Sequence, residues 1–114
     1  MSRRNPAAKG KADANHKAIA DAIRAIGYPV MDLSAAGNGV EDLLVGLRRY
    51  DPNWARYDCW WLVVEAKNLK GRGLRFTDDQ VEWRDRTQGW PRITVTSGQD
   101  AVDQIRKMTD RERC

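Results

Sequence analysis

Three charged residues lie in two stretches that are otherwise typical of buried strands. The stretch "VEDLLVG", residues 40–46, holds Asp42, and "LVVEAKN", residues 62–68, holds Glu65 and Lys67. Burying an unpaired charge is unfavourable, so we expect these residues to have a partner, a metal ion or a catalytic role. Because side chains alternate along a strand, Glu65 and Lys67 are expected to point the same way at the end of one strand.

This combination has a specific chemical use if Asp42 lies on the neighbouring strand. Two adjacent carboxylates, from Asp42 and Glu65, repel each other unless a proton or a cation lies between them. A hard divalent cation such as Mg²⁺ prefers carboxylate, water and phosphate oxygens. Lys67 beside such an ion could stabilise phosphate charge or help to activate a water. The alternative is a plain cross-strand ion pair between Asp42 and Lys67.

Periodicity and turn signals predict the elements that must position these residues. In chain order they are a helix from Asp13 to about Gly27, strands over Tyr28–Leu33, Glu41–Arg48 and Cys59–Lys67, a helix over Thr77–Gln88, a strand over Arg92–Thr96 and a helix over Ser97–Met108. The third and fourth strands, joined by a helix, are expected to be parallel with a right-handed crossover. We therefore predict an α/β fold with a central four-stranded mixed sheet flanked by helices.

Two helix starts carry recognisable caps. Thr77 and Gln80 form a T-x-x-Q capping box, and Ser97 is expected to cap the last helix. Four tryptophans within or next to elements, Trp60, Trp61, Trp83 and Trp90, are expected in the core. Trp54 lies in a turn, where packing or a dimer contact is favoured over stacking on an unpaired base.

Length and composition limit the number of domains and the classes of protein to which the chain can belong. The 114 residues suit one domain over 13–114, preceded by a flexible basic arm over 1–12. Apolar residues make up 41% of the chain, which argues against disorder, and no apolar run approaches a membrane span. The basic start is not followed by an apolar signal segment. Two cysteines cannot build a disulfide framework, so we expect a cytoplasmic protein.

Basic residues gather in two places. The chain has 20 basic and 16 acidic residues, a net charge of +4, with clusters at its start and in the glycine-containing segment after Lys67. Such clusters suit a phosphate backbone, although a solvated surface is the alternative. The candidate nucleic-acid-binding residues are Lys11, Lys17, Lys70, Arg72 and Arg75.

The chemistry-bearing residues also match a family pattern. Asp42 with the apolar run 43–45, followed by Glu65-Ala66-Lys67, resembles the D…E-x-K signature of the PD-(D/E)XK nuclease superfamily. The closer resemblance is to its VRR-NUC branch of stand-alone phage and prophage proteins, through "GNGVEDLLVG", "VVEAKN" and "RFTDDQVEWRD" in that order. The likeness covers about residues 12–105. It implies a restriction-endonuclease-like αβββαβ core, followed here by a C-terminal helix.

The resemblance also implies roles for individual residues. Asp42, Glu65 and the backbone carbonyl of Ala66 would bind Mg²⁺ or Mn²⁺. Lys67 would be the catalytic lysine, and Gln80 would lie near the site from the following helix. These four side chains, of Asp42, Glu65, Lys67 and Gln80, form the predicted catalytic set.

Two positions depart from the family pattern. Glu41 replaces the proline that precedes the metal-binding aspartate, and alternation should turn it away from that aspartate, so it is an outside candidate. Ala18 stands where relatives often carry a glutamate in the first helix, and Asn15, His16 or Asp21 could substitute. For His16, which falls on the apolar stripe of its helix, a packing role is the alternative.

The function implied is a metal-dependent DNA endonuclease that recognises nucleic-acid shape, such as a branch, a flap or a Holliday junction. The sequence contains no major-groove reading helix that we recognise, and stand-alone relatives resemble junction-directed, dimeric nucleases. We therefore expect a homodimer that binds DNA, in a bacterial or phage-infected host, with no membrane and no organic cofactor. The alternative is a catalytically weak nucleic-acid-binding or accessory module of a phage replication or packaging assembly.

Overall fold

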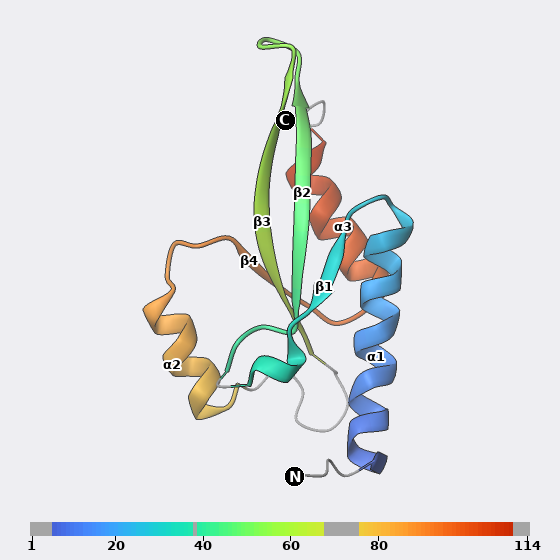
Figure 1. Ribbon diagram of the computed structural model, residues 1–114, viewed down its shortest axis with the longest axis vertical. Helices are drawn as coiled ribbons and strands as arrows, with labels where there is room; N and C mark the ends of the chain where they lie inside the picture. The colour runs from blue at the N-terminus through green and yellow to red at the C-terminus, as the bar shows by residue number, and fades with distance from the viewer. Residues whose placement is uncertain (1–5, 38, 68–75, 111–114) are drawn as a thin grey trace.

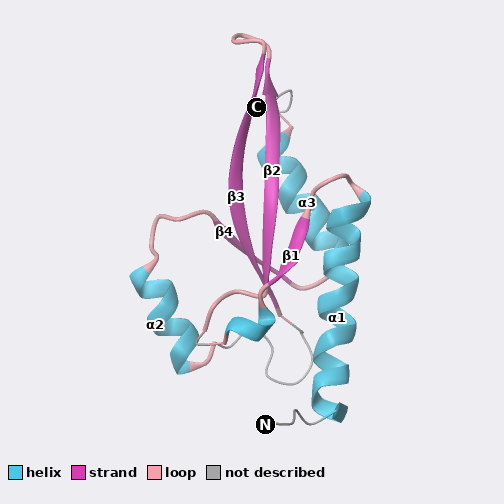
Figure 2. Cartoon of the chain, viewed as in Figure 1, coloured by secondary structure: helices cyan, strands magenta, loops and turns pink. Residues whose placement is uncertain are grey.

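The structure, a computed structural model, describes residues 6–37, 39–67 and 76–110, and it describes side chains from residue 15 onward. Figure 1 and Figure 2 show its elements. In chain order they are helix α1 (Pro6–Ala25), strand β1 (Val30–Asp32), a short 3-10 helix (Ser34–Ala36), strands β2 (Leu43–Asp51) and β3 (Arg56–Ala66), helix α2 (Asp78–Arg86), strand β4 (Arg92–Val95) and helix α3 (Gly98–Thr109).

The four strands form one mixed sheet in the order β1-β2-β3-β4. Strand β2 is antiparallel to both β1 and β3, whereas β3 and β4 are parallel and are joined through α2. The predicted α/β class, with a four-stranded mixed sheet and three helices, is confirmed. The parallel pair brings the carboxyl ends of β3 and β4 to the same edge of the sheet.

One face of the sheet carries the core, which α1 and α3 cover (Figure 1). Alternate residues of β2 and β3 point into it, as the period of a strand requires. The helices contribute small and branched side chains on single stripes. The buried core residues are Ile19, Ala20, Ile23, Leu43, Val45, Leu47, Leu62, Val64, Ile93, Val95, Ala101 and Ile105.

The opposite face is largely open, and two tryptophan predictions are wrong for this reason. Trp61 is 65% exposed and Trp90 is 67% exposed, while Trp60 packs partly against the core and Trp83 is half-buried. Helix α2 lies on the other side of the sheet from α1 and buries none of its residues (Figure 1). A helix that buries no side chain cannot cover a sheet face, so tryptophans on that face stay in contact with solvent.

Several boundaries differ from those predicted. Helix α1 begins at Pro6, seven residues earlier than expected. The division into a flexible arm over 1–12 and a domain over 13–114 stays a prediction. No helix among the described residues is both long enough and apolar enough to cross a membrane. The β2–β3 hairpin is longer than predicted, because the Asp51 carboxylate accepts the Asn53 N–H at 3.0 Å and closes a short turn.

Candidate active site at the ends of β2 and β3

Asp42 and Glu65 lie side by side at one end of the hairpin. The last paired residues of β2 and β3 there are Leu43 and Val64, so one further step brings Asp42 opposite Glu65. Opposed residues of an antiparallel pair share a face. The Asp42 Oδ2 atom accepts the backbone N–H of Ala66 at 2.8 Å, which fixes this carboxylate against the end of β3. The expected convergence of the two carboxylates is therefore present.

Lys67 and Gln80 complete a connected set around Glu65. The Lys67 Nζ atom lies 3.5 Å from Glu65 Oε2, as expected for side chains two residues apart on a strand end. Gln80 donates its amide N–H to Glu65 Oε2 at 2.7 Å and accepts from Lys67 Nζ at 3.0 Å. One glutamine thus holds both a carboxylate and an ammonium group.

The electrostatic environment destabilises two negative charges at this point. Burial, and then the charge of Asp42, raise the pKa of Glu65 to about 7. Burial also raises the pKa of Asp42, although the Ala66 N–H and the charges of His16 and Lys67 act in the opposite direction. Both carboxylates therefore resist full ionisation unless positive charge joins them.

The donor set fits a hard divalent cation in type. Two carboxylates with raised pKa values are the ligands that Mg²⁺ or Mn²⁺ would stabilise in ionised form. Within the described part of the chain, no group of three or more His, Cys, Asp and Glu side chains is arranged to hold a metal ion. A cation bound here would thus rely on Asp42, Glu65, a backbone oxygen such as that of Ala66, and oxygens from water or substrate, which is typical of Mg²⁺.

A glycine turn sets the start of α2 against the site. Gly39 has φ of +81°, and a Cβ atom there would lie 2.2 Å from the backbone oxygen of Asp79. The turn therefore touches the backbone of the first helical turn. The predicted capping box is confirmed: Thr77 Oγ1 accepts the Gln80 N–H at 3.2 Å, and Gln80 Oε1 accepts the Thr77 N–H at 2.9 Å. Gln80 therefore takes part both in the cap of α2 and in the ionic set, by which we mean Asp42, Glu65 and Lys67.

Glu41 anchors α2 from behind the site. Only 1% of its surface is exposed, and its partners differ from the Ala66 N–H that bonds Asp42. Its Oε1 accepts the indole N–H of Trp83 at 2.8 Å. Its Oε2 lies 3.5 Å from Arg92 Nε and 3.9 Å from Arg84 Nη1, without a hydrogen bond to either. This carboxylate thus connects the segment before β2 with Trp83 and Arg84 of α2 and with Arg92 of β4.

The first helix contributes two of its three candidates to this region. Asn15 donates to the backbone oxygen of Lys67 at 3.4 Å. His16 is buried, and its Nε2 atom lies 3.6 Å from Asp32 Oδ1. Asp21 is instead exposed and pairs within α1 with Lys17 and Arg24, and these contacts hold the pKa of the Asp21 carboxyl below its usual value.

The candidate backbone-binding residues are only partly described. Lys17 is exposed, and its Nζ atom lies 2.8 Å from Asp21 on the next turn of α1. The side chain of Lys11 and the whole of Lys70, Arg72 and Arg75 lie outside the described residues. Their predicted contact with nucleic acid stays a prediction.

One aromatic neighbour of the site was not predicted from the sequence. Lys67 Nζ lies 4.6 Å from the centre of the Phe76 ring, and the Arg84 guanidinium lies 4.5 Å from it. Such cation–π contacts orient a cation without neutralising it. Phe76 directly precedes the cap residue Thr77, and Val81 is the fourth residue of α2. These are the two positions of a hydrophobic staple. This staple pattern was the sequence signal that could have identified Phe76.

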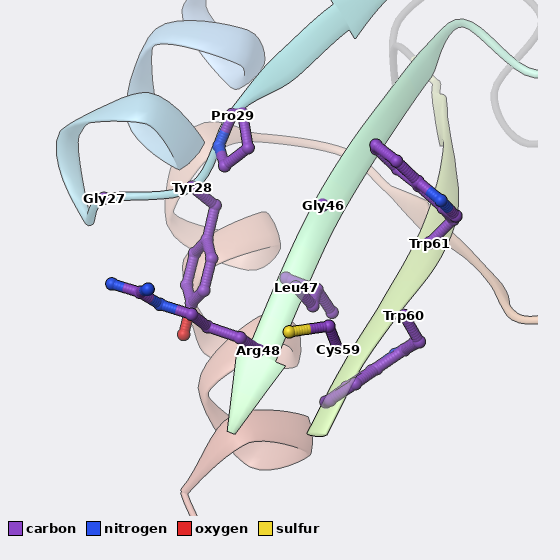
Figure 3. Close-up of a pocket in the computed structure, with 9 residues that line it drawn as sticks. All are labelled: Gly27, Tyr28, Pro29, Gly46, Leu47, Arg48, Cys59, Trp60 and Trp61. Atoms are coloured by element: carbon purple, nitrogen blue, oxygen red, sulfur yellow. The ribbon is translucent and has the colours of Figure 1, made fainter. Parts of the chain in front are cut away.

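A separate hollow lies on the sheet away from the ionic set (Figure 3). Its volume is about 470 Å³, and it lies where β2 continues past the start of β1. The lining includes Tyr28, Gly46, Arg48, Cys59 and Trp61. Neither Asp42 nor Glu65 is part of its lining, so this hollow is separate from the candidate site.

Comparison of the chain with protein-family models, with curated proteins and with solved structures finds no match. The candidate site therefore stands on its own geometry.

Proposed function

We propose that this protein is a metal-dependent DNA endonuclease that hydrolyses phosphodiester bonds at structured DNA such as flaps, branches or four-way junctions. The observation that carries the proposal is that Asp42 and Glu65 oppose each other at the ends of two paired strands, with the hydrogen-bonded Lys67–Gln80 pair beside Glu65. The resemblance of "VVEAKN" and "RFTDDQVEWRD" to the VRR-NUC branch supports the same reading. On this proposal, the sheet and helices form the αβββαβ core of that superfamily.

Each residue of the set has a distinct part in such a reaction. Asp42 and Glu65, with the Ala66 carbonyl, would hold Mg²⁺ or Mn²⁺. When bound, the cation would neutralise phosphate charge and lower the pKa of a water. Lys67 would donate to a phosphate oxygen or orient the attacking water, because its Nζ lies beside Glu65. Gln80 would keep Lys67 directed toward the carboxylates.

We expect the protein to select DNA by shape, because contacts to the DNA backbone and a dimeric arrangement would not read a base sequence. On this proposal no helix reads the major groove: α2 has only nine residues, and α1 and α3 contribute side chains to the core. Contacts to the sugar–phosphate backbone position a substrate without reading its sequence. We also propose a homodimer, because two sites would act on two strands of a branched substrate. Its place of action would be the cytoplasm of a bacterium or of a phage-infected host.

The test is a cleavage assay with matched variants. Linear, nicked, flapped and four-way DNA are incubated with the wild-type protein in Mg²⁺, in Mn²⁺ and in EDTA. We expect metal-dependent cutting that favours branched forms and is lost in Glu65→Gln and Lys67→Ala. Glu82→Gln, an exposed change on α2, is the control and should cut normally. Tight binding without cutting in any metal would contradict the proposal and favour a binding module.

A further inference from the structure

An aromatic hollow lies on α2 next to the candidate active site. Its volume is about 450 Å³, which exceeds that of one nucleobase, and its lining includes Phe76, Val81, Arg84, Trp90 and Arg92. Trp90 is 67% exposed and Val81 is 55% exposed. Large apolar side chains exposed together around a hollow indicate a contact surface rather than a core.

Phe76 connects this hollow to Lys67. Its ring lies 4.6 Å from Lys67 Nζ and is also part of the lining of the hollow. Lys67 and the hollow therefore share one aromatic neighbour. The two features are adjacent parts of one surface.

Two guanidinium groups line the hollow, those of Arg84 and Arg92. The buried carboxylate of Glu41 lies outside the lining, 3.9 Å from Arg84 Nη1 and 3.5 Å from Arg92 Nε. Arg84 Nη1 is buried and has no hydrogen-bond partner in the described part of the chain. Asp85 is the one acidic residue of the lining. An anionic sugar–phosphate chain carrying a flat apolar base matches this combination of charge and aromatic surface.

We propose that this hollow binds an unstacked nucleobase from the nucleotide next to the cleaved phosphate, with Trp90 as the stacking platform. This inference rests on the proposed function and adds the feature of the substrate that is recognised. An exposed indole stacks on any base, because every base presents a π face. The contact would therefore require an unpaired base without requiring a particular sequence.

The hollow supplies a physical reason for selectivity toward flaps and branches. A base in a continuous duplex must be unstacked and unpaired before it can enter, which costs a few kcal/mol. A base at a flap or branch is already free, so the same stacking contact is gained without that cost. Discrimination between the two substrates then follows from the base and does not need duplex-specific contacts.

The test removes the base and the indole separately and together. Flap DNA is prepared with a normal nucleotide or an abasic one at each unpaired position beside the cut, and affinities are measured in EDTA, where no cutting occurs. Stacking on an aromatic side chain is worth about 1–3 kcal/mol per base, so Trp90→Ala should weaken binding about 5- to 150-fold. At one position the abasic change should weaken binding equally, and the two changes together should add nothing further.

Controls separate this inference from folding and from catalysis. Trp54→Ala changes an equally exposed tryptophan on the hairpin turn and should leave the base dependence intact. Trp90→Phe keeps an aromatic face and should restore most of the affinity. Independent, additive losses from the base and from Trp90 at every position would overturn the inference. Because the measurement is of binding, coupling between base and indole would still establish the hollow if no DNA were cut and the nuclease proposal failed.

Discussion

Gln80 donates its amide N–H to Glu65 Oε2 at 2.7 Å and accepts from Lys67 Nζ at 3.0 Å, so one side chain bonds both residues. Its amide has a single orientation here, because the oxygen already accepts from Lys67 and from the Thr77 N–H. The glutamine therefore serves the ionic set as well as the helix cap. Two substitutions separate these two roles.

We expect Gln80→Ala to lower kcat about 100-fold, since small misplacements of catalytic groups have effects of that size. Thr77→Ala removes the hydroxyl acceptor of the cap and should cost about 1 kcal/mol of stability, while the Gln80 contacts to Glu65 and Lys67 remain. Cleavage rates and urea unfolding of both variants check this. Equal losses of activity in the two variants would show that Gln80 acts only as a cap.

The raised pKa of Glu65 predicts a pH-dependent stability in the absence of metal. Between the ordinary pKa of 4.5 and the folded value of about 7, the folded protein keeps a proton that the unfolded chain has lost. Stability should therefore fall as pH rises from 4.5 to 7 and stay level above it. At about 1.4 kcal/mol per pKa unit, this gap corresponds to about 3 kcal/mol.

Urea unfolding in EDTA at several pH values measures this slope. Glu65→Gln should remove most of it, and the raised pKa of Asp42 should leave a smaller slope of the same sign. A stability that is flat from pH 5 to 7 in the wild-type protein would contradict this account of the carboxylate pair.

Much of this arrangement follows from sequence pattern, and the reasons are local. The period of a strand predicts that Glu65 and Lys67 share a face, and short-range hydrogen bonds decide the caps at Thr77 and Ser97. The meeting of Asp42 with Glu65 needs only the antiparallel pairing of two neighbouring strands. These features depend on residues close in sequence or on one strand pair.

The burial of a side chain by an element distant in sequence could not be predicted from local sequence pattern. Alternation assigns Trp61 to a face, but it does not say whether a helix covers that face, and α2 does not. The burial of Glu41 depends on Arg92, some fifty positions further along the chain, and on Trp83 of α2. Because tryptophan is usually buried, the sequence predicts that Trp90 lies in the core. In the structure Trp90 follows α2 and is exposed.

Glu41 should be required for stability even though it lies outside the catalytic set. Glu41→Ala leaves the guanidinium groups of Arg84 and Arg92 without their shared buried carboxylate. Removing one partner of a buried ion pair costs about 3 kcal/mol or more. Urea or thermal unfolding checks this, with exposed Glu82→Ala as the control. A loss within about 0.5 kcal/mol, which is usual for surface changes, would mean that Glu41 does not anchor α2.

Two glycines of one turn give a matched test of how α2 is positioned. Gly37 and Gly39 both have positive φ, at +69° and +81°, but only Gly39 faces a close backbone. Gly37→Ala should cost about 1 kcal/mol through backbone strain alone. Gly39→Ala should cost about 1–3 kcal/mol more and should lower activity, because the backbone at Asp79 must move. Unfolding and cleavage assays on both variants check this, and equal effects would contradict the close contact.

The central claim is that Asp42 and Glu65 bind one divalent cation between them. Its most direct test is titration of the DNA-free protein with Mn²⁺ at pH 8, above the pKa of Glu65, with free Mn²⁺ measured by electron paramagnetic resonance. We predict that the wild-type protein and Glu82→Gln bind Mn²⁺ alike, and that Asp42→Asn and Glu65→Gln each bind it about 10-fold more weakly or worse. The same affinity in all four proteins would contradict the claim.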